Sequence, residues 1–331
     1  MKYKKLGNSN IEISSMGLGC MGMSFAYGTP DDKESILTLE RSLELGINFW
    51  DTADVYGNGQ NEELISKVLV NNRDKIVLAT KFGFRMKNAK TNEMYLDCSK
   101  KHIKEAVEDS LKRLKIDVID LYYMHRVDPN TPFDESVNAM SELVIEGNVK
   151  FLVISDCTAD DLQKSISIHS ISALQSEYSL LTKDVEKEML PLTKKLGITF
   201  VAFSPLIRGF ISDALDVKSL DDTDMRKTLP RFQDEYLENN KMLSEEFSKF
   251  ASSKNCTSAQ LAIAWVMAQS ENIVPIPGTK KRKYLEENTK AVDVVLTSKD
   301  LEAIGDIIKK YPNVGPRYGA KQQQFLKQNQ K

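Results

Sequence analysis

The chain has 331 residues, of which 41% are hydrophobic and 28% are charged, and both values are ordinary for a soluble globular protein. Lysine and arginine number 45 and acidic residues 47, so the net charge of −2 argues against a dedicated nucleic-acid-binding protein. No apolar run reaches the roughly 20 residues that cross a bilayer, and no apolar signal core follows Met1, so we expect a cytoplasmic protein that neither spans a membrane nor is secreted. The four cysteines form no CxxC pair and the histidines number three, so we expect no metal site.

The first segment, residues 1–14, predicts a small hairpin because two short strands flank the turn-forming residues 7–10. Eight short runs rich in Ile, Val and Phe follow, with no polar alternation, which is typical of strands buried on both faces. These runs are residues 15–18, 47–50, 76–80, 119–124, 149–154, 173–175, 199–203 and 273–275.

Amphipathic periodicity predicts helices between these strands. In residues 99–114 and 132–146, apolar residues recur every three or four positions. Thr131, Thr158 and Ser258 are among the expected N-caps, and Gly46, Gly147 and Gly197 stand where helices end.

Strand and helix alternate eight times, so we predict one α/β domain over residues 1–331, a single (β/α)₈ TIM barrel with an N-terminal hairpin and long loops at its C-terminal face. The alternative is a doubly wound Rossmann sheet, but the glycine-rich stretch 17–22 follows a hairpin and not a βαβ unit. Residues 205–238 are polar and aperiodic, which predicts a long active-site loop, and residues 311–331 predict a polar C-terminal tail.

Ionisable side chains close three consecutive predicted strands. Asp51 ends the second strand, Lys81 the third and His125 the fourth, while Tyr56 follows in the loop after Asp51. In a barrel these strand ends meet at one face. Each residue alone has an ordinary structural explanation, and it is their joint occurrence at adjacent strand ends that indicates a site.

This set of side chains suits the reduction of a carbonyl group. A phenol such as Tyr56 can protonate the oxygen that becomes an alkoxide, and a nearby ammonium would lower the pKa of that phenol. A carboxylate holds the ammonium in place, and a neutral imidazole orients the carbonyl. No metal or covalent intermediate is required, because a nicotinamide cofactor would carry the hydride.

The motifs DTADVYG at 51–57, KFG at 81–83 and LYYMHRVDP at 121–129 resemble those of the aldo-keto reductase superfamily, in its general bacterial, fungal and plant branch near the pyridoxal reductases. The resemblance covers nearly the whole chain and implies NADP(H) as cofactor and a small-molecule carbonyl as substrate. It implies that Tyr56 is the general acid, Lys81 its pKa modulator, Asp51 the partner of Lys81 and His125 the donor that orients the carbonyl.

The resemblance also implies a set of cofactor contacts. Ser155, Asp156 and Gln175 would hold the nicotinamide carboxamide, and Phe203 would stack on the nicotinamide ring. The pyrophosphate would lie against Ser204, Leu206 and Arg208. The remaining implied contacts come from the ends of the first, second and last strands and the helix after the last, and they are Gly19, Cys20, Met21, Asp51, Gly278, Thr279, Lys280, Glu287 and Asn288.

Four consecutive cations, residues 280–283, precede a predicted helix, although the N-terminal end of a helix favours anions. The resemblance places the 2′-phosphate of NADPH there, with Thr279 and Lys280 as its contacts and with Glu287 and Asn288 touching the adenine.

Three features depart from the family pattern: residues 153–155 replace a strand end that usually contains Gly, Asp156 stands where Asn or Glu is common, and Ile207 stands where Gly is frequent. The alternative function is an NADP(H)-binding regulatory or interaction protein on the same barrel, similar to potassium-channel β subunits. A lyase or isomerase without a nicotinamide cofactor is a third, weaker alternative, and neither the particular substrate nor the oligomeric state is predicted.

Overall fold

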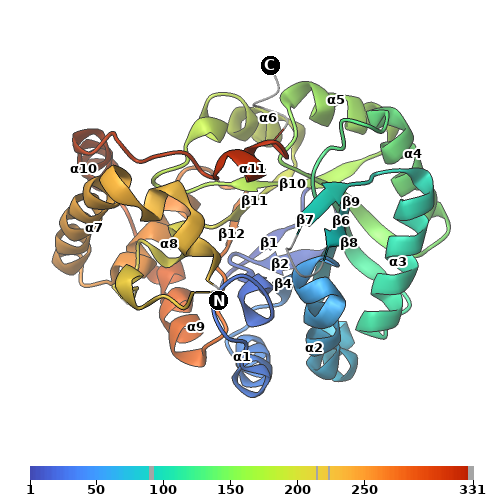
Figure 1. Cartoon of the computed structure of the whole chain (residues 1–331), viewed down its shortest axis with the longest axis horizontal. Helices are drawn as coiled ribbons and strands as arrows, with labels where there is room; N and C mark the ends of the chain where they lie inside the picture. The colour runs from blue at the N-terminus through green and yellow to red at the C-terminus, as the bar shows by residue number, and fades with distance from the viewer. Residues whose placement is uncertain (89–92, 214, 223, 327–331) are drawn as a thin grey trace.

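The computed structural model describes residues 1–88, 93–213, 215–222 and 224–326. Within these residues the main sheet has eight parallel strands in the order β12-β11-β10-β9-β8-β5-β4-β3, surrounded by helices (Figure 1). The strands are β3 (Leu18–Gly19), β4 (Phe49–Asp51), β5 (Val77–Phe82), β8 (Ile119–Met124), β9 (Val149–Ser155), β10 (Ile171–Glu177), β11 (Thr199–Phe203) and β12 (Ile273–Ile276). The predicted (β/α)₈ barrel is therefore confirmed.

The barrel closes between its first and last strands. Gly17 N donates to Pro275 O at 2.9 Å, and Gly19 forms a parallel bridge with Gly278. A side chain at Gly19 would place its Cβ 2.9 Å from the carbonyl oxygen of Ile276, so this close approach of two backbones requires glycine.

The helices follow the predicted alternation. They are α1 (Asp32–Glu44), α2 (Gln60–Leu69), α3 (Lys100–Leu114), α4 (Phe133–Ile145), α5 (Ala159–Ile168), α6 (Met189–Leu196), α7 (Asp234–Ser253), α8 (Ser258–Ala268), α9 (Arg282–Thr289), α10 (Ser298–Lys310) and α11 (Ala320–Gln323). Thr158 caps α5 as predicted, whereas Pro132 takes the N-cap position of α4 in place of Thr131, and Thr257 caps α8 in place of Ser258. Gly46, Gly147 and Gly197 follow helices with positive φ, as predicted.

Alternation along the strands separates two cores. One core lies between the strands and the helices, and the other fills the barrel, where Phe49, Val77, Leu121 and Val201 meet. Successive side chains of a strand point to opposite faces, so residues two positions further along these strands also point inward. This rule brings Asp51, Lys81 and Phe203 toward the barrel axis.

The predicted N-terminal hairpin, β1 (Tyr3–Lys5) paired with β2 (Glu12–Ser14), is present. Its residues Leu6 and Ile13 are fully buried and join the core inside the barrel. The hairpin therefore closes the N-terminal end of the barrel with apolar side chains.

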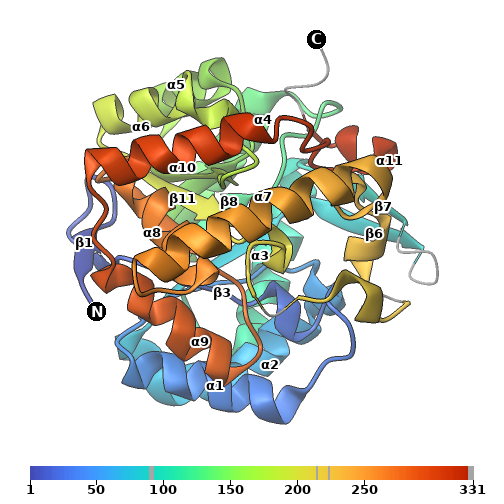
Figure 2. The same cartoon turned by 90° about the vertical axis from the view of Figure 1, so that its left-hand side faces the viewer.

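Three features at the other end differ from the sequence-based expectations. A second hairpin, β6 (Phe84–Asn88) with β7 (Glu93–Leu96), follows β5, and α7 begins at Asp234, inside the stretch predicted as loop up to 238. The C-terminal segment, predicted only as a polar tail, runs past α7 toward the β6–β7 hairpin (Figure 2). Residues 214 and 223 of the predicted loop and 327–331 of the predicted tail lie outside the described residues.

No helix in the part of the chain that the structure describes is long and apolar enough to span a membrane.

Candidate active site

The site begins with a buried ion pair at the ends of two neighbouring strands. The Lys81 ammonium pairs with Asp51 Oδ1 and also donates to Thr52 O at 2.7 Å. Gln175 Nε2 donates to Asp51 Oδ2 at 2.8 Å, so both carboxylate oxygens of Asp51 are engaged. Because the Lys81 side chain is fully buried, these contacts fix its position within the barrel.

Tyr56 lies beside this ion pair, on the short 3-10 helix Tyr56–Gly59 that follows β4. Gly57 and Gly59 in this turn have φ of 58° and 91°, a left-handed conformation that glycine adopts without strain. The Lys81 Nζ atom lies 5.3 Å from the centroid of the Tyr56 ring, and the Phe25 ring stacks on the same phenol at 6.2 Å between centroids. The turn thus brings the phenol to the ammonium.

His125 completes the group on a third strand end. Its backbone N–H donates to Phe82 O at 2.9 Å, which continues the strand pairing and directs the imidazole inward. The imidazole lies edge-on to Tyr56 at 5.9 Å and to Phe84 at 5.0 Å between ring centroids. Its buried Nδ1 atom has no hydrogen-bond partner among the described residues. The structure therefore brings Asp51, Tyr56, Lys81 and His125 together.

The protonation of this group follows from its burial. Burial raises the pKa of Tyr56 well above its ordinary value, and the negative charge of Asp51 raises it further. Burial likewise lowers the pKa of His125 well below its ordinary value, with Arg126 and Lys81 acting in the same direction. At neutral pH, Tyr56 is a protonated phenol and His125 a neutral imidazole.

The positive charge of Arg126 acts against this rise in the pKa of Tyr56, but the exclusion of water from the phenol outweighs it. The role of Lys81 as modulator of that pKa stays a prediction. Burial also lowers the pKa of Lys81, although the Asp51 carboxylate opposes that shift.

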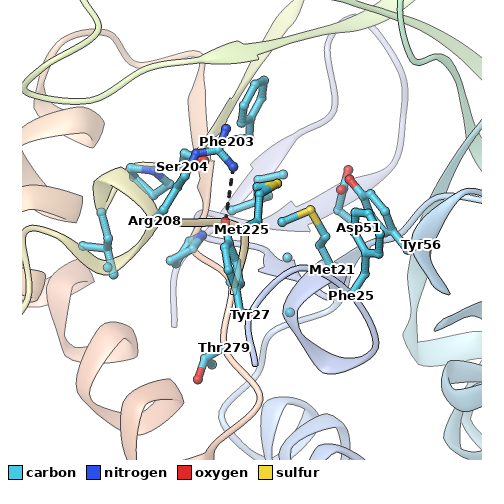
Figure 3. Close-up of a pocket in the computed structure, with 18 of the residues that line it drawn as sticks. Met21, Phe25, Tyr27, Asp51, Tyr56, Phe203, Ser204, Arg208, Met225 and Thr279 are labelled. Carbon is cyan, nitrogen blue, oxygen red and sulfur yellow. Dashed lines mark hydrogen bonds between the residues drawn. The ribbon is translucent and has the colours of Figure 1, made fainter. Parts of the chain in front are cut away.

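A cavity of about 490 Å³ opens above these residues, a size typical of small-molecule sites. Figure 3 shows Tyr56, Asp51, Met21 and Phe25 on one side of this cavity, with Phe203, Ser204 and Arg208 across from them. The predicted site residues that line the cavity are Gly19, Met21, Asp51, Tyr56, His125, Gln175, Phe203, Ser204, Leu206, Arg208, Gly278, Thr279, Lys280, Glu287 and Asn288. Lys81 does not line the cavity and contributes from beneath it.

Three predicted cofactor contacts do not reach this cavity. Cys20 is fully buried, and Ser155 and Asp156 are covered by the side chain of Arg126, which does line the cavity. Arg126 Nη1 donates to Ser155 Oγ at 3.3 Å, and Arg126 Nη2 pairs with Asp156 Oδ2 at 3.0 Å. The Arg126 guanidinium therefore contacts both side chains in this structure, and their assignment to the carboxamide stays a prediction.

The loop after β11 has an unusual backbone. Ser204, Ile207 and Arg208 have φ of 53°, 53° and 57° without being glycine. This conformation is an outlier for a β-branched residue such as Ile207, and the burial of its side chain, which is 2% exposed, offsets the strain. Arg208 Nη1 donates to the Tyr27 hydroxyl at 3.4 Å, and this contact joins the loop to the segment after β3 (Figure 3).

The end of the cavity away from Tyr56 is basic. Of the four cations at 280–283, Arg282 is neutralised by Glu34. Glu34 accepts hydrogen bonds from the Arg282 backbone and guanidinium at 3.0–3.1 Å, so a carboxylate of the chain already serves the start of α9. Lys280 and Lys281 line the cavity, and Lys280 Nζ donates to the carbonyls of Tyr27 and Thr29 at 2.7 Å each.

Sequence reasoning did not single out several cavity residues, namely Tyr27, Arg226, Tyr318, Phe325 and Leu326. Arg226 stacks on the Tyr27 ring at 4.9 Å and pairs with Asp224 at 2.7 Å, which anchors the long loop over the segment after β3. Arg226 lies within the stretch 205–238 that was predicted as an active-site loop. No local pattern marks the other four residues, because the cavity brings them together from distant parts of the chain.

A parallel barrel that gathers a phenol, a buried ammonium and an imidazole beside one cavity at the carboxyl ends of its strands is typical of the class of barrel enzymes, whose active sites lie at that end. The comparisons with known proteins narrow this class. The model of the Aldo/keto reductase family matches residues 15–309. The chain therefore belongs to the aldo/keto reductase family, whose members are oxidoreductases that act on carbonyl compounds.

Individual relatives agree with this assignment. The chain is 41% identical over 316 residues to "Probable aldo-keto reductase 1" of Glycine max, covering 95% of this chain and 91% of the relative. Among solved structures, the glycerol dehydrogenase AKR11B4 from Gluconobacter oxydans is similar with a TM-score of 0.86 at 26% identity, covering 93% of this chain and 95% of that one. The aldo-keto reductase AKR11C1 from Bacillus halodurans, in its holo form, has a TM-score of 0.78 at 30% identity, covering 93% and 96%.

Proposed function

We propose that this protein reduces aldehydes or ketones to alcohols with NADPH, and that Tyr56 is the general acid. The observation that carries the proposal is the neutral phenol of Tyr56 at the floor of the cavity, with the Lys81 ammonium 5.3 Å from its ring centroid. A group that is protonated at neutral pH and adjoins a fixed positive charge is suited to donate a proton to a developing alkoxide.

The neighbouring side chains have complementary roles in this proposal. Neutral His125 donates a hydrogen bond to the carbonyl oxygen and orients it toward Tyr56. As the proton leaves Tyr56, the Lys81 ammonium stabilises the phenolate, and Asp51 keeps that ammonium charged and in place. The phenol is therefore a weak acid at rest, and in this proposal the positive charge of Lys81 offsets part of the cost of forming the phenolate.

The residues present fit a nicotinamide cofactor, which supplies the hydride when bound. The cavity extends from Tyr56 past the exposed side of Phe203 to the basic residues Lys280 and Lys281, as an elongated ligand with an anionic end would require. The guanidinium of Arg208 lies along this path and suits a pyrophosphate. We assign the preference for NADPH over NADH to Lys280 and Thr279 at the basic end.

We place this activity in the cytoplasm. No disulfide links the cysteines of the described residues, and Cys20 and Cys98 are buried thiols, as suits a protein of a reducing compartment.

A turnover assay tests the proposal. Purified protein is mixed with 4-nitrobenzaldehyde and either NADPH or NADH, and loss of the reduced nicotinamide is followed together with formation of the alcohol. We expect stoichiometric turnover and at least a tenfold lower KM for NADPH than for NADH, because a charge-assisted hydrogen bond contributes about 1.5–3 kcal/mol.

Two results would contradict the proposal. Tight NADPH binding without turnover across a panel of aldehydes and ketones would favour the regulatory alternative. Equal KM values for the two cofactors would remove the assignment of the 2′-phosphate to Lys280 and Thr279.

A further inference from the structure

The C-terminal segment is held on the barrel by side chains that donate to its backbone. Asn239 donates to Tyr311 O at 3.2 Å, and Asn240 donates to Val314 O at 3.1 Å. Arg231 Nε donates to Gly315 O at 3.2 Å. These donors come from α7 and from the loop before it, so the path of the segment is set before it reaches the cavity.

Arg317 then inserts between two buried carboxylates. Its Nη2 pairs with Asp156 Oδ2 and its Nε with Glu177 Oε2, each at 3.2 Å. The guanidinium side chain is 12% exposed, and the two carboxylate side chains are each 3% exposed. Asp156 and Glu177 follow or end neighbouring strands, so a single side chain of the C-terminal segment bridges two strand ends.

The same guanidinium touches the cofactor side of the site. Its carbon lies 5.7 Å from the centroid of Phe203, and Asp156 also pairs with Arg126, which lines the cavity. Burial opposes the ionisation of Asp156, but the charges of Arg126 and Arg317 hold the pKa of this carboxyl below its ordinary value. Asp156 therefore remains an anion that forms ion pairs with both Arg126 and Arg317.

Beyond Arg317 the segment supplies one wall of the cavity, through Tyr318, Phe325 and Leu326. Phe325 meets Phe84 of β6 edge-on at 5.3 Å between ring centroids, and Phe84 in turn meets His125 at 5.0 Å. The wall on the His125 side of the cavity is thus aromatic, and it consists of residues from a hairpin and from the C-terminal segment.

We propose that Arg317 is a positioning residue that latches the C-terminal segment onto the strand ends, and that the segment thereby places Phe325 as the specificity-determining wall for carbonyl substrates with a planar aromatic group. This inference rests on the proposed function. Arg317 already satisfies two carboxylates and does not line the cavity, so it acts on the substrate through the segment that it holds and not by direct contact.

The test is a double-mutant cycle on the purified full chain, with Arg317→Ala, Phe325→Ala and the double variant. For each, kcat and KM are measured with 4-nitrobenzaldehyde and with propanal. We expect each single variant to lose about tenfold in its preference for the aromatic aldehyde, through KM more than through kcat, because the aromatic wall then no longer packs against the ring of the substrate. The double variant loses no more than either single variant.

Additive losses in the double variant, or an unchanged aromatic preference in Arg317→Ala, would overturn the inference. Arg317→Lys keeps the charge but not the planar fork, so we expect it to restore only part of the preference. If Arg317→Ala fails to fold, Phe325→Ala and Arg317→Lys still decide the question, because an unchanged preference in both contradicts the proposal.

Two further measurements separate positioning from general stability. Lys310→Ala removes an exposed ion pair with Glu246 at the end of α10, just before the same segment, and should leave the preference unchanged. Chymotrypsin should cut at Tyr318 or Phe325 sooner in Arg317→Ala than in the parent protein, and equal cleavage would contradict the latch. If the parent reduces neither aldehyde, the proposed function fails, while faster cleavage of the variant still establishes the latch.

Discussion

The two ends of the barrel are built from the same strands but contain opposite chemistry. At the N-terminal end, the hairpin inserts Leu6 and Ile13 into an apolar core with Phe49 and Val77. At the C-terminal end, two and four positions further along those strands, the inward positions are occupied by Asp51 and Lys81. The same strands therefore supply an apolar core at the N-terminal end and the site residues at the C-terminal end, and only the polarity of the inward-pointing residues differs between the two ends.

The two ends of the barrel also differ in which residues take the left-handed backbone conformation. Turns that lead from helices into strands at the N-terminal end use Gly46, Gly147 and Gly197 at positive φ. Loops at the C-terminal end have Asp156, Ser204 and Ile207 in that region, each at a cost of about 1–3 kcal/mol. The end that carries the site thus has more non-glycine residues in this conformation, although Lys115 after α3 shows that the N-terminal end is not free of them.

The largest expected effect is on turnover at the candidate active site, for Tyr56→Phe. Removing the hydroxyl removes the proposed proton donor while the Phe25 stacking and the cavity shape are retained, so kcat should fall by about 10²–10⁴-fold. Steady-state kinetics and fluorescence titration with NADPH measure turnover and binding separately, and cofactor affinity should stay within about twofold. Retained turnover would show that the acid is another group.

A change in the apolar core at the N-terminal end of the barrel should affect stability and not activity. Leu6→Ala removes a fully buried side chain from the core inside the barrel, so the free energy of unfolding should fall by about 2–5 kcal/mol. Urea denaturation followed by circular dichroism measures the loss. The KM and kcat of the folded variant should match those of the parent protein, and a changed KM for the aldehyde would mean that the two ends are coupled.

The smallest effect concerns the left-handed backbone by itself. Gly147 has φ of 82° and open space around its missing Cβ, so Gly147→Ala should cost about 1–2 kcal/mol of unfolding free energy, from backbone strain alone. Gly305 inside α10 also has open space but no positive φ, so Gly305→Ala is the matched control and should add about 0.5–1 kcal/mol. Thermal denaturation compares the two, and changes of the same sign would contradict this account of the strain.

The elements that were predicted most closely are those with continuous apolar runs. The expected strands 119–124 and 199–203 agree with β8 and β11, and Asp51, Lys81 and His125 meet as the strand ends indicated. The strand expected at 173–175 is longer, Ile171–Glu177, and its polar last residue, Glu177, is buried against the arginines at 231 and 317. A local pattern cannot show that a charge so placed is compensated by residues that far along the chain.

The position of the C-terminal segment was still harder to predict from local sequence patterns. It has few apolar residues, so periodicity gives no sign that it packs on the barrel. Its position depends on single long-range contacts, such as Asn240 to Val314 and Arg317 to Asp156. Ser155 and Asp156 were assigned to the cofactor by the family resemblance, and nothing local in the sequence indicates that Arg126 contacts them.

The closure of the barrel at Gly19 and Gly278 has a consequence for folding during synthesis of the protein. Its two strands come from near opposite ends of the chain, so a ribosome must synthesise most of the protein before the ring can close. Until β12 emerges, β3 and β11 each present an unpaired edge to the surroundings, and such edges invite association between nascent copies. Chaperone protection during synthesis is therefore most needed just before the last strand is added.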